Sequence, residues 1–284
     1  MEKKVDDETG AVESLLVPLS PSRASDFKNC PQLFKFRVID RLPEPADIYS
    51  ARGSLVHAVL ESLLRLDPAA RTIGYAHGAL ADHWAELKAL EEFAAVELDP
   101  AEELAWLDSC RQLLSNYFDI EDPCTISPEE LEWWVEHEGD TAFLRGIIDR
   151  VEVMPGGEWI LSDYKTGRSP SETYALGSFF GLKFYALVCW RAFGKMPAML
   201  RLLHLKEPEV ITLVPSQQML EGLERQLNAI AKAIGRAHEK DDWRPHPSRL
   251  CDWCPHQAIC PAFPVTAGSP ADPGVGQELA SQVT

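Results

Sequence analysis

Two apolar segments joined by a tight turn place the strongest constraint on how this chain can fold. Residues 143–153 and 158–165 have the alternation of strands, and the Met-Pro-Gly-Gly run between them has the composition of a turn. If the hairpin is centred on the first of these glycines, Asp149 lies directly opposite Asp163. Lys165 follows Asp163 by two positions, so both side chains point to one face of the strand. The sequence therefore predicts a cluster of Asp, Asp and Lys on one side of a sheet.

Two facing carboxylates are costly to place in a sheet. About 5 Å apart, at an effective dielectric constant of about 20, they repel by roughly 3 kcal/mol. Lys165 offsets part of this cost, and a hard divalent cation such as Mg²⁺ or Mn²⁺, which prefers oxygen ligands, offsets more. The alternative is an exposed ladder of ion pairs, with Arg150 and Lys165 on the surface. Both strands are largely apolar, which favours a buried sheet, where an unpaired charge is expensive, and hence a metal site. The apolar residues concerned are Ile147, Ile148, Val151, Val153, Ile160 and Leu161.

The rest of the chain alternates between helical and strand-like patterns. Helices are expected after Ser22, from Gly53 onward, and over residues 174–193 and 216–239. Further strands are expected over residues 131–137, 199–205 and 210–214. Two acidic amphipathic helices within about 76–125, broken near Pro100, are expected to form a helical insertion. This order of elements predicts an α/β core with a mixed central sheet flanked by helices.

The two ends of the chain differ in composition from its middle. Residues 1–18 mix acidic residues with a few aliphatic ones, and residues 265–284 are rich in Gly, Ala, Ser and Pro. Both compositions are typical of flexible tails. We therefore expect one folded domain over residues 19–264.

Acidic residues are concentrated in one part of the chain. The chain has 44 Asp and Glu against 27 Lys and Arg, a net charge of −17, yet residues 80–140 contain eighteen of these acids and two of these bases. The remainder is close to neutral, so the overall charge is compatible with a DNA partner. No apolar run approaches the roughly 20 residues of a membrane span, and the first ten residues do not resemble a signal peptide. We therefore expect a cytoplasmic protein that does not bind membranes.

Short motifs surround the predicted carboxylate cluster. Residues 146–150 read Gly-Ile-Ile-Asp-Arg and residues 163–167 read Asp-Tyr-Lys-Thr-Gly. They resemble the G-x-x-D-R and D-x-K-T-G motifs of RecB-family exonucleases in the PD-(D/E)xK nuclease superfamily. Gly53 and His57 match that family's G-x-x-x-H motif, and Tyr185 stands where its Q-x-x-x-Y motif has the tyrosine. Gly181 replaces the glutamine of this last motif, a departure that concerns a contact beside the active site.

This resemblance implies a PD-(D/E)xK, restriction-endonuclease-like core and a role for each matched residue. Asp149 and Asp163 would hold the divalent metal, helped by His57 and the backbone carbonyl of Tyr164. Lys165 would orient or deprotonate the attacking water and stabilise the charge that grows on the phosphate. The residues alone leave an alternative, because His57 and Tyr185 both have apolar neighbours and also suit positions in the core.

Seven cysteines, an odd number, argue against a disulfide framework and for metal ligation or buried thiols. Cys251, Cys254 and Cys260 have the spacing C-x2-C-x5-C, and Cys30 is the natural candidate for a fourth thiolate. Four thiolates suit either an iron–sulfur cluster or structural zinc, and His256 could replace one of them. Cys110, Cys124 and Cys189 lack such spacing and are interpreted as buried or incidental thiols.

The split cysteine pattern is similar to the 4Fe-4S site of iron–sulfur RecB-family nucleases, including AddB-type subunits and CRISPR-associated exonucleases. The resemblance therefore implies a 4Fe-4S cluster on Cys30, Cys251, Cys254 and Cys260. Such a cluster would act as a clasp that ties the N-terminal helix to the C-terminal segment.

Taken together, the motifs predict a Mg²⁺- or Mn²⁺-dependent DNA exonuclease that acts in DNA repair, recombination, or CRISPR or phage DNA processing. Its expected partners are single-stranded or duplex DNA ends and a helicase or another repair or CRISPR protein. One alternative is a non-catalytic iron–sulfur DNA-binding module with a decaying nuclease site. Another is an electron-transfer protein, which would leave Asp149, Asp163 and Lys165 unexplained.

Overall fold

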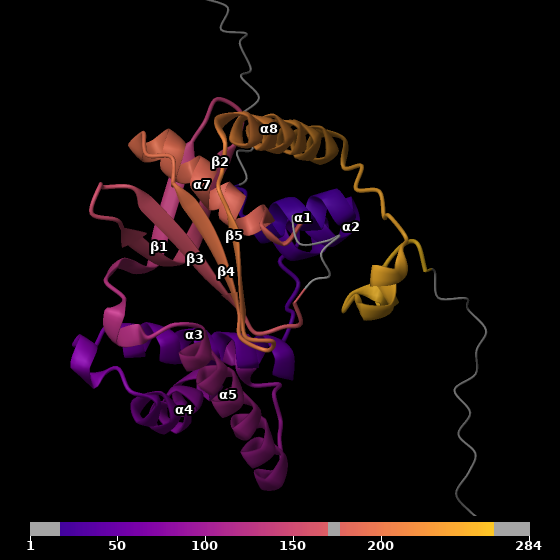
Figure 1. The fold of residues 1–284 in the computed structure, drawn as a ribbon. Helices are drawn as coiled ribbons and strands as arrows, with labels where there is room; N and C mark the ends of the chain where they lie inside the picture. Colours follow the sequence, from indigo (N-terminus) through magenta and orange to yellow (C-terminus); the bar gives the residue numbers. More distant parts are fainter. Residues whose placement is uncertain (1–17, 170–176, 264–284) are drawn as a thin grey trace, which may run out of the picture.

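The computed structural model describes residues 18–169 and 177–263. A five-stranded sheet forms its centre, in the order β1-β2-β3-β4-β5, and helices lie on both of its faces (Figure 1). The strands are β1 (Pro128–Glu138), β2 (Phe143–Val153), β3 (Trp159–Lys165), β4 (Met199–His204) and β5 (Glu209–Leu213). Strands β3 and β4 pair in parallel, and the other neighbours pair antiparallel. The predicted α/β fold with a mixed sheet is confirmed.

The helices begin and end at residues suited to these positions. They are α1 (Pro21–Asn29), α2 (Pro31–Phe34), α3 (Ile48–Leu64), α4 (Ile73–Lys88), α5 (Pro100–Ile120), α7 (Phe180–Phe193) and α8 (Gln217–Lys240). The Asp47 and Asp99 carboxylates accept backbone N–H groups at the starts of α3 and α5. Gly194 ends α7 in the left-handed conformation, with a φ of 68°.

The predicted helix over residues 174–193 is observed as α7, and residues 170–176 lie outside the described part of the chain. The same holds for residues 1–17 and 264–284, which include most of the predicted tails. None of the described helices is long and apolar enough to cross a bilayer.

Two apolar clusters cover the two faces of the sheet. One lies between the sheet and α1, α7 and α8, and it includes Leu161 and Leu202. The other lies between the sheet and α3, α4 and α5, which Figure 1 shows as a separate layer, and it includes Tyr164 and Leu203. We call these the α7 side and the α3 side. Helices α4 and α5, expected as an insertion, pack against α3 as part of this second layer.

Strand β1 changes faces in mid-strand. In β1, Leu131 packs on the α3 side, whereas Trp133 and Val135 pack on the α7 side. Glu132, between them, has a φ of 47°, in the left-handed region that non-glycine residues rarely adopt. Two successive side chains, Leu131 and Glu132, therefore point to the α3 side.

Candidate active site

Strands β2 and β3 separate at Asp149. The register expected from the turn is the observed one, because Arg150 pairs with Ser162 and Val151 with Leu161. Asp149 and Asp163 are the next residues in this register. Beyond this point the Asp149 Oδ2 atom accepts the backbone N–H of Tyr164, at 2.8 Å. A carboxylate thus takes the place of a backbone acceptor where the two strands part.

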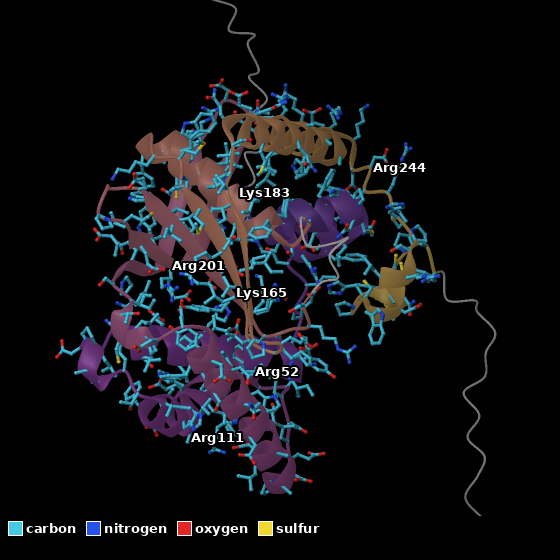
Figure 2. The ribbon with its side chains drawn as sticks, viewed as in Figure 1. Arg52, Arg111, Lys165, Lys183, Arg201 and Arg244 are labelled. Carbon is cyan, nitrogen blue, oxygen red and sulfur yellow. The ribbon has the colours of Figure 1, made fainter. Side chains whose placement is uncertain are left out.

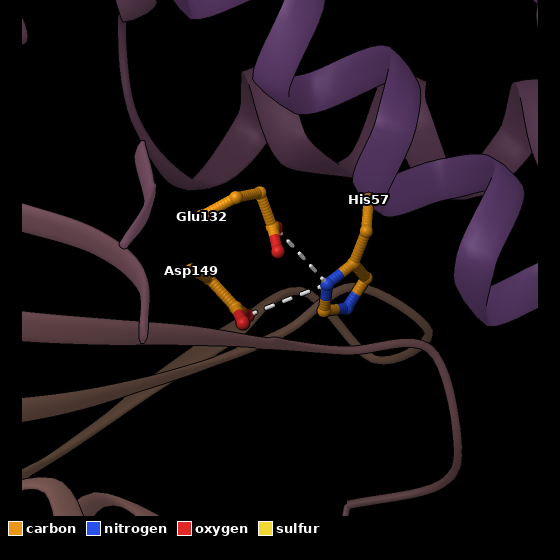
Figure 3. Close-up of side chains that lie close together, drawn as sticks. All are labelled: His57, Glu132 and Asp149. Carbon is orange, nitrogen blue, oxygen red and sulfur yellow. Dashed lines mark ion pairs between the residues drawn. The ribbon is translucent and has the colours of Figure 1, made fainter. Parts of the chain in front are cut away.

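Three side chains from separate elements meet beside this opening (Figure 3). The Nδ1 atom of His57, on α3, lies 3.5 Å from Asp149 Oδ2 and 3.9 Å from Glu132 Oε1. One ligand atom from each of the three residues lies within 4.8 Å of the others. Among the described residues no other set of three His, Cys, Asp or Glu side chains is this close.

The backbone of Tyr164 orients the imidazole of His57. The Nε2 atom of His57 lies 3.0 Å from the Tyr164 carbonyl oxygen, so an Nε2–H donates to that carbonyl and the Nδ1 atom faces the carboxylates. A histidine that binds a metal commonly has its other nitrogen fixed in this way. The Tyr164 carbonyl, expected beside the metal, is therefore in contact with His57 in this structure.

Glu132 was not among the candidates from the sequence. Leu131 pairs with Arg150 and Trp133 with Ile148, so Glu132 is opposite Asp149. Counting outward from the turn at residues 140–141 would have given this pairing, because Glu132 precedes the turn by as many residues as Asp149 follows it. The sequence therefore contained the signal, although four other glutamates in β1 obscure it.

Asp163 and Lys165 form a second pair at the end of β3. The Lys165 ammonium lies 2.5 Å from Asp163 Oδ2, and 43% of the lysine side chain, which is labelled in Figure 2, is exposed. Asp163 does not belong to the close group of His57, Glu132 and Asp149. Its negative charge nevertheless acts on both His57 and Asp149. The cluster expected from the hairpin is thus divided into a group of three and an adjoining ion pair.

Tyr185, on α7, lies on the opposite side of β2. Its ring explains why the Gly-Ile-Ile-Asp-Arg motif begins with a glycine, Gly146. A Cβ atom on Gly146 would lie 2.4 Å from the Tyr185 ring, a distance that real Cβ contacts do not show. The partly buried Tyr185 hydroxyl is hydrogen-bonded to the backbone of Ile147, and burial and the charges of Asp163 and Asp149 raise its pKa. Gly181, where the resemblance expects glutamine, faces Pro21 of α1 at 4.0 Å from a built Cβ.

The site carries an excess of negative charge. Burial alone would lower the pKa of His57, but the charges of Asp149, Asp163 and Glu132 raise it to about 9. Burial, together with the charges of Asp163 and Glu132, raises the pKa of Asp149 to about 7. The charge of His57 and the hydrogen bond from the Tyr164 N–H act in the opposite direction and lower this pKa. The raised pKa values of both His57 and Asp149 mean that each group tends to keep its proton. The site therefore favours bound positive charge.

Arg150 supports the site from within the fold. Its side chain is fully buried, pairs with Glu121 and Glu152, and donates to the Tyr164 hydroxyl at 2.9 Å. The alternative in which Arg150 lies in an exposed ion-pair ladder is therefore wrong. A buried arginine with several acceptors fixes β2 and β3 on either side of the opening.

Cys30, Cys251, Cys254 and Cys260 line one cavity of about 260 Å³ between α1, α2 and the C-terminal segment. None of them forms a disulfide. The backbone N–H groups of His246 and Ser248 donate to the sulfurs of Cys30 and Cys251, at 3.4 and 3.3 Å. No three of these four sulfurs lie within 4.8 Å of one another.

The remaining candidates near this cavity have other surroundings. His256 is buried with its Nε2 atom 2.6 Å from Glu44 and its ring against Phe36, so it is in contact with a carboxylate. Cys110 and Cys189 are buried and Cys124 is exposed, and burial raises the pKa values of the Cys110 and Cys189 thiols to about 11 and about 12. The Cys110 and Cys189 thiols are therefore not activated nucleophiles.

Comparison with known proteins identifies a family whose sequence profile matches this chain and a solved structure with a similar fold. The sequence profile of the PD-(D/E)XK nuclease superfamily matches residues 18–261. A solved structure from Eubacterium rectale, provisionally named an exonuclease, aligns with a TM-score of 0.57 at 13% identity and covers 94% of this chain and 100% of that chain. The structure of SSO0001 covers 75% of this chain and 95% of that chain at 15% identity, with a TM-score of 0.36, too low to support an argument. No curated protein matches the chain.

Proposed function

The chain belongs to the PD-(D/E)XK nuclease superfamily, and from this premise we propose that it is a metal-dependent exonuclease that hydrolyses phosphodiester bonds in DNA. The observation that carries the proposal is the convergence of His57, Glu132 and Asp149 within 4.8 Å, beside the Asp163–Lys165 pair. On the resemblance to RecB-family enzymes we further propose a role in DNA repair, recombination, or CRISPR or phage DNA processing, together with a helicase or other partner.

The donor set fits a hard divalent cation. Carboxylate oxygens and one imidazole nitrogen suit Mg²⁺ or Mn²⁺, and opposite ligands of Mg²⁺ are about 4.2 Å apart, close to the span of the group. His57, Asp149 and Glu132 would hold the ion, with Asp163 as the third carboxylate. The ion would supply Lewis-acid polarisation of the scissile phosphate.

The protein's own residues would do the rest of the chemistry. Lys165 is partly exposed, so its ammonium can reach an attacking water or a phosphate oxygen and stabilise the negative charge that develops there. Asp163 holds Lys165 in place, and the Tyr164 carbonyl holds the His57 ring. Tyr185 would act as a positioning residue, because its ring packs against β2 at Gly146, three residues before Asp149.

We also propose a 4Fe-4S cluster on Cys30, Cys251, Cys254 and Cys260. A single zinc ion with Zn–S bonds of about 2.3 Å brings its sulfurs to roughly 3.8 Å from one another. No three of these sulfurs lie within 4.8 Å of one another, and a spacing wider than that of one zinc ion supports a larger cofactor. The purified protein should be brown and carry about four iron and four sulfide per chain. A colourless protein with one zinc after anaerobic preparation would overturn this proposal.

End-labelled single-stranded and duplex DNA, with free and blocked ends, tests the activity in Mn²⁺. We expect degradation from free ends. Asp149→Asn and Asp163→Asn should lose both Mn²⁺ binding and cleavage, whereas Lys165→Ala should lose cleavage and keep Mn²⁺ affinity within a few fold. Asp242→Asn, which changes an exposed acid paired with Arg244, is the matched control. Full cleavage by Asp149→Asn would place the active site elsewhere.

A further inference from the structure

The face of β1 and β2 that carries Glu132 and Asp149 continues beyond the active site. Leu144, Ile148 and Val135 pack on the α7 side, so the residues that alternate with them point to the opposite face. These are Glu132 and Trp134 on β1, and Arg145, Ile147 and Asp149 on β2. Trp134 and Ile147 are directly paired across the two strands. An apolar surface therefore adjoins the acidic site.

This surface is accessible and aromatic. Trp134 is 51% exposed and Ile147 is 41% exposed. The Arg145 guanidinium lies over the Trp134 ring, 5.6 Å from its centroid, and the indole N–H donates to Glu136 at 3.3 Å. These contacts hold the ring in place and leave half of the side chain open. We call Trp134 and Ile147 the stacking platform.

Basic side chains gather beside the platform. The N-terminal segment pairs with β2, since the Arg145 N–H donates to the Leu19 carbonyl at 2.9 Å. This pairing brings the first turn of α1 alongside, and burial and the nearby charges of Arg145 and Arg41 lower the pKa of Arg23. We call Arg23, Arg41 and Arg145 the arginine cluster.

The arginine cluster is not neutralised by ion pairs with the described acidic side chains. Within residues 18–169 and 177–263, none of its three guanidinium groups has a carboxylate within 4 Å, as judged from the ion pairs observed there. In a chain with a net charge of −17, mutually repelling arginines without acidic partners suit an external anion. The phosphates of a nucleic acid strand provide such a series of anions.

We propose that this face binds single-stranded DNA, with an unpaired base stacked on the platform and the flanking phosphates held by the arginine cluster. The inference rests on the proposed nuclease function and specifies its substrate. Trp134 follows Glu132 by two residues, roughly 6.6 Å along a strand, so the stacked base would belong to a nucleotide next to the scissile phosphate. In a duplex the base faces are already stacked on one another, which leaves none for Trp134.

Binding in EDTA tests the platform separately from cleavage. Fluorescence anisotropy with the full-length protein should show that Trp134→Ala weakens binding of a single-stranded oligonucleotide about ten-fold, and that Trp134→Phe keeps most of the affinity. Trp253→Ala removes a tryptophan that is 86% exposed and should have no such effect. Oligonucleotides with one abasic position give a sharper comparison. The abasic position that weakens binding to the wild type most should hardly change the affinity of Trp134→Ala, because the ring that would stack on the missing base is already absent.

Salt dependence tests the arginine cluster. For single strands, each phosphate contact contributes about 0.7 to the slope of log affinity against log salt concentration. Arg41→Gln and Arg145→Gln should each lower the slope by about this amount, whereas Arg244→Gln, at an exposed arginine already paired with Asp242, should not. Melting temperatures of all variants show whether each remains folded.

The possible results separate this inference from the function on which it rests. If affinity and slope are the same in wild type and every platform and cluster variant, the inference is wrong even if DNA is cleaved. Equal Trp134-dependent binding of duplex DNA, or of RNA, would overturn the choice of single-stranded DNA. If Trp134-dependent binding occurs without cleavage in Mn²⁺, the binding surface stands and the proposed nuclease function fails.

Discussion

Glu132 has a left-handed backbone, with a φ of 47°, inside strand β1. Such a conformation costs on the order of 1 kcal/mol for a residue with a Cβ atom. In return, the Glu132 carboxylate faces His57 and lies opposite Asp149. A sequence pattern can place Glu132 opposite Asp149, but it cannot reveal a single reversed φ, because the reversal depends on how both strands pack on α3 and α7.

We expect Glu132→Gly to separate stability from metal binding. Glycine adopts this backbone without a Cβ penalty, so the melting temperature should stay the same or rise. Mn²⁺ affinity, measured by titration calorimetry, should fall at least about ten-fold, the scale seen even when outer-sphere partners are lost. The control, Glu136→Gly, replaces a residue of the same strand and should lose up to about 1 kcal/mol without loss of Mn²⁺. Equal destabilisation of the two variants would mean that Glu132 does not have a left-handed backbone in solution.

Gly146 gives a second test at the level of residues. The added methyl group of Gly146→Ala meets the Tyr185 ring, and we expect destabilisation by about 1–3 kcal/mol in urea unfolding. In a Tyr185→Ala background the same change should cost much less, because the ring is absent. Strictly additive effects would mean that the two residues are not in contact.

At the scale of elements, the register of β2 and β3 could be predicted from the turn between them, because a short hairpin fixes its own pairing. The burial of Arg150 could not be predicted from the turn, because its partners Glu121 and Glu152 come from the end of α5 and from β2 itself. Glu121 also pairs with Arg201 of β4. One carboxylate at the end of a helix thus joins two strands of the sheet, a relation that no local pattern contains.

The stability of this network should depend on pH in a defined direction. Burial alone would raise the pKa of Glu121, but the hydrogen bond and charge of Arg150 and the charge of Arg201 lower it below the usual 4.5. A group whose pKa is lower in the folded protein stabilises the fold above its unfolded pKa and loses that effect as the pH falls. The contribution of Glu121 should therefore be complete at pH 7 and decline below about pH 4.5.

Glu121→Gln tests this network. The variant should be less stable by about 3 kcal/mol at pH 7, since it leaves a buried arginine short of a partner. Its free energy of unfolding should fall less steeply on acidification than that of the wild type. Urea unfolding at pH 7, 5.5 and 4 measures both effects, with the exposed Glu97→Gln as control. Parallel pH profiles for wild type and Glu121→Gln would contradict the assigned role of the ion pair.

At the scale of the whole molecule, the structure brings the two ends of the folded chain together. His246 donates its backbone N–H to Cys30, and its Nδ1 atom lies 3.0 Å from the Asn29 carbonyl. The cysteine spacing predicted that Cys30 would join Cys251, Cys254 and Cys260, and all four line one cavity. The layer formed by α3, α4 and α5 was less predictable, because helical periodicity identifies an apolar face but not the element that it covers.

Cys30 is the residue whose replacement best tests this long-range arrangement. If it is the fourth ligand of a 4Fe-4S cluster, Cys30→Ser should lose iron and melting temperature as severely as Cys254→Ser, because a site with three thiolates is open to oxidative loss of iron. Losing the cluster would release the contact between α1 and the C-terminal segment, so DNA cleavage should fall while Asp149, Asp163 and Lys165 are unchanged. Cys110→Ser, Cys124→Ser and Cys189→Ser should keep their iron and cost no more than the roughly 0.5–3 kcal/mol of ordinary substitutions. Iron content and melting temperature across these five variants decide the matter. Normal values for Cys30→Ser, with Cys110→Ser or Cys124→Ser depleted of iron, would place the fourth ligand on the α3 side of the sheet.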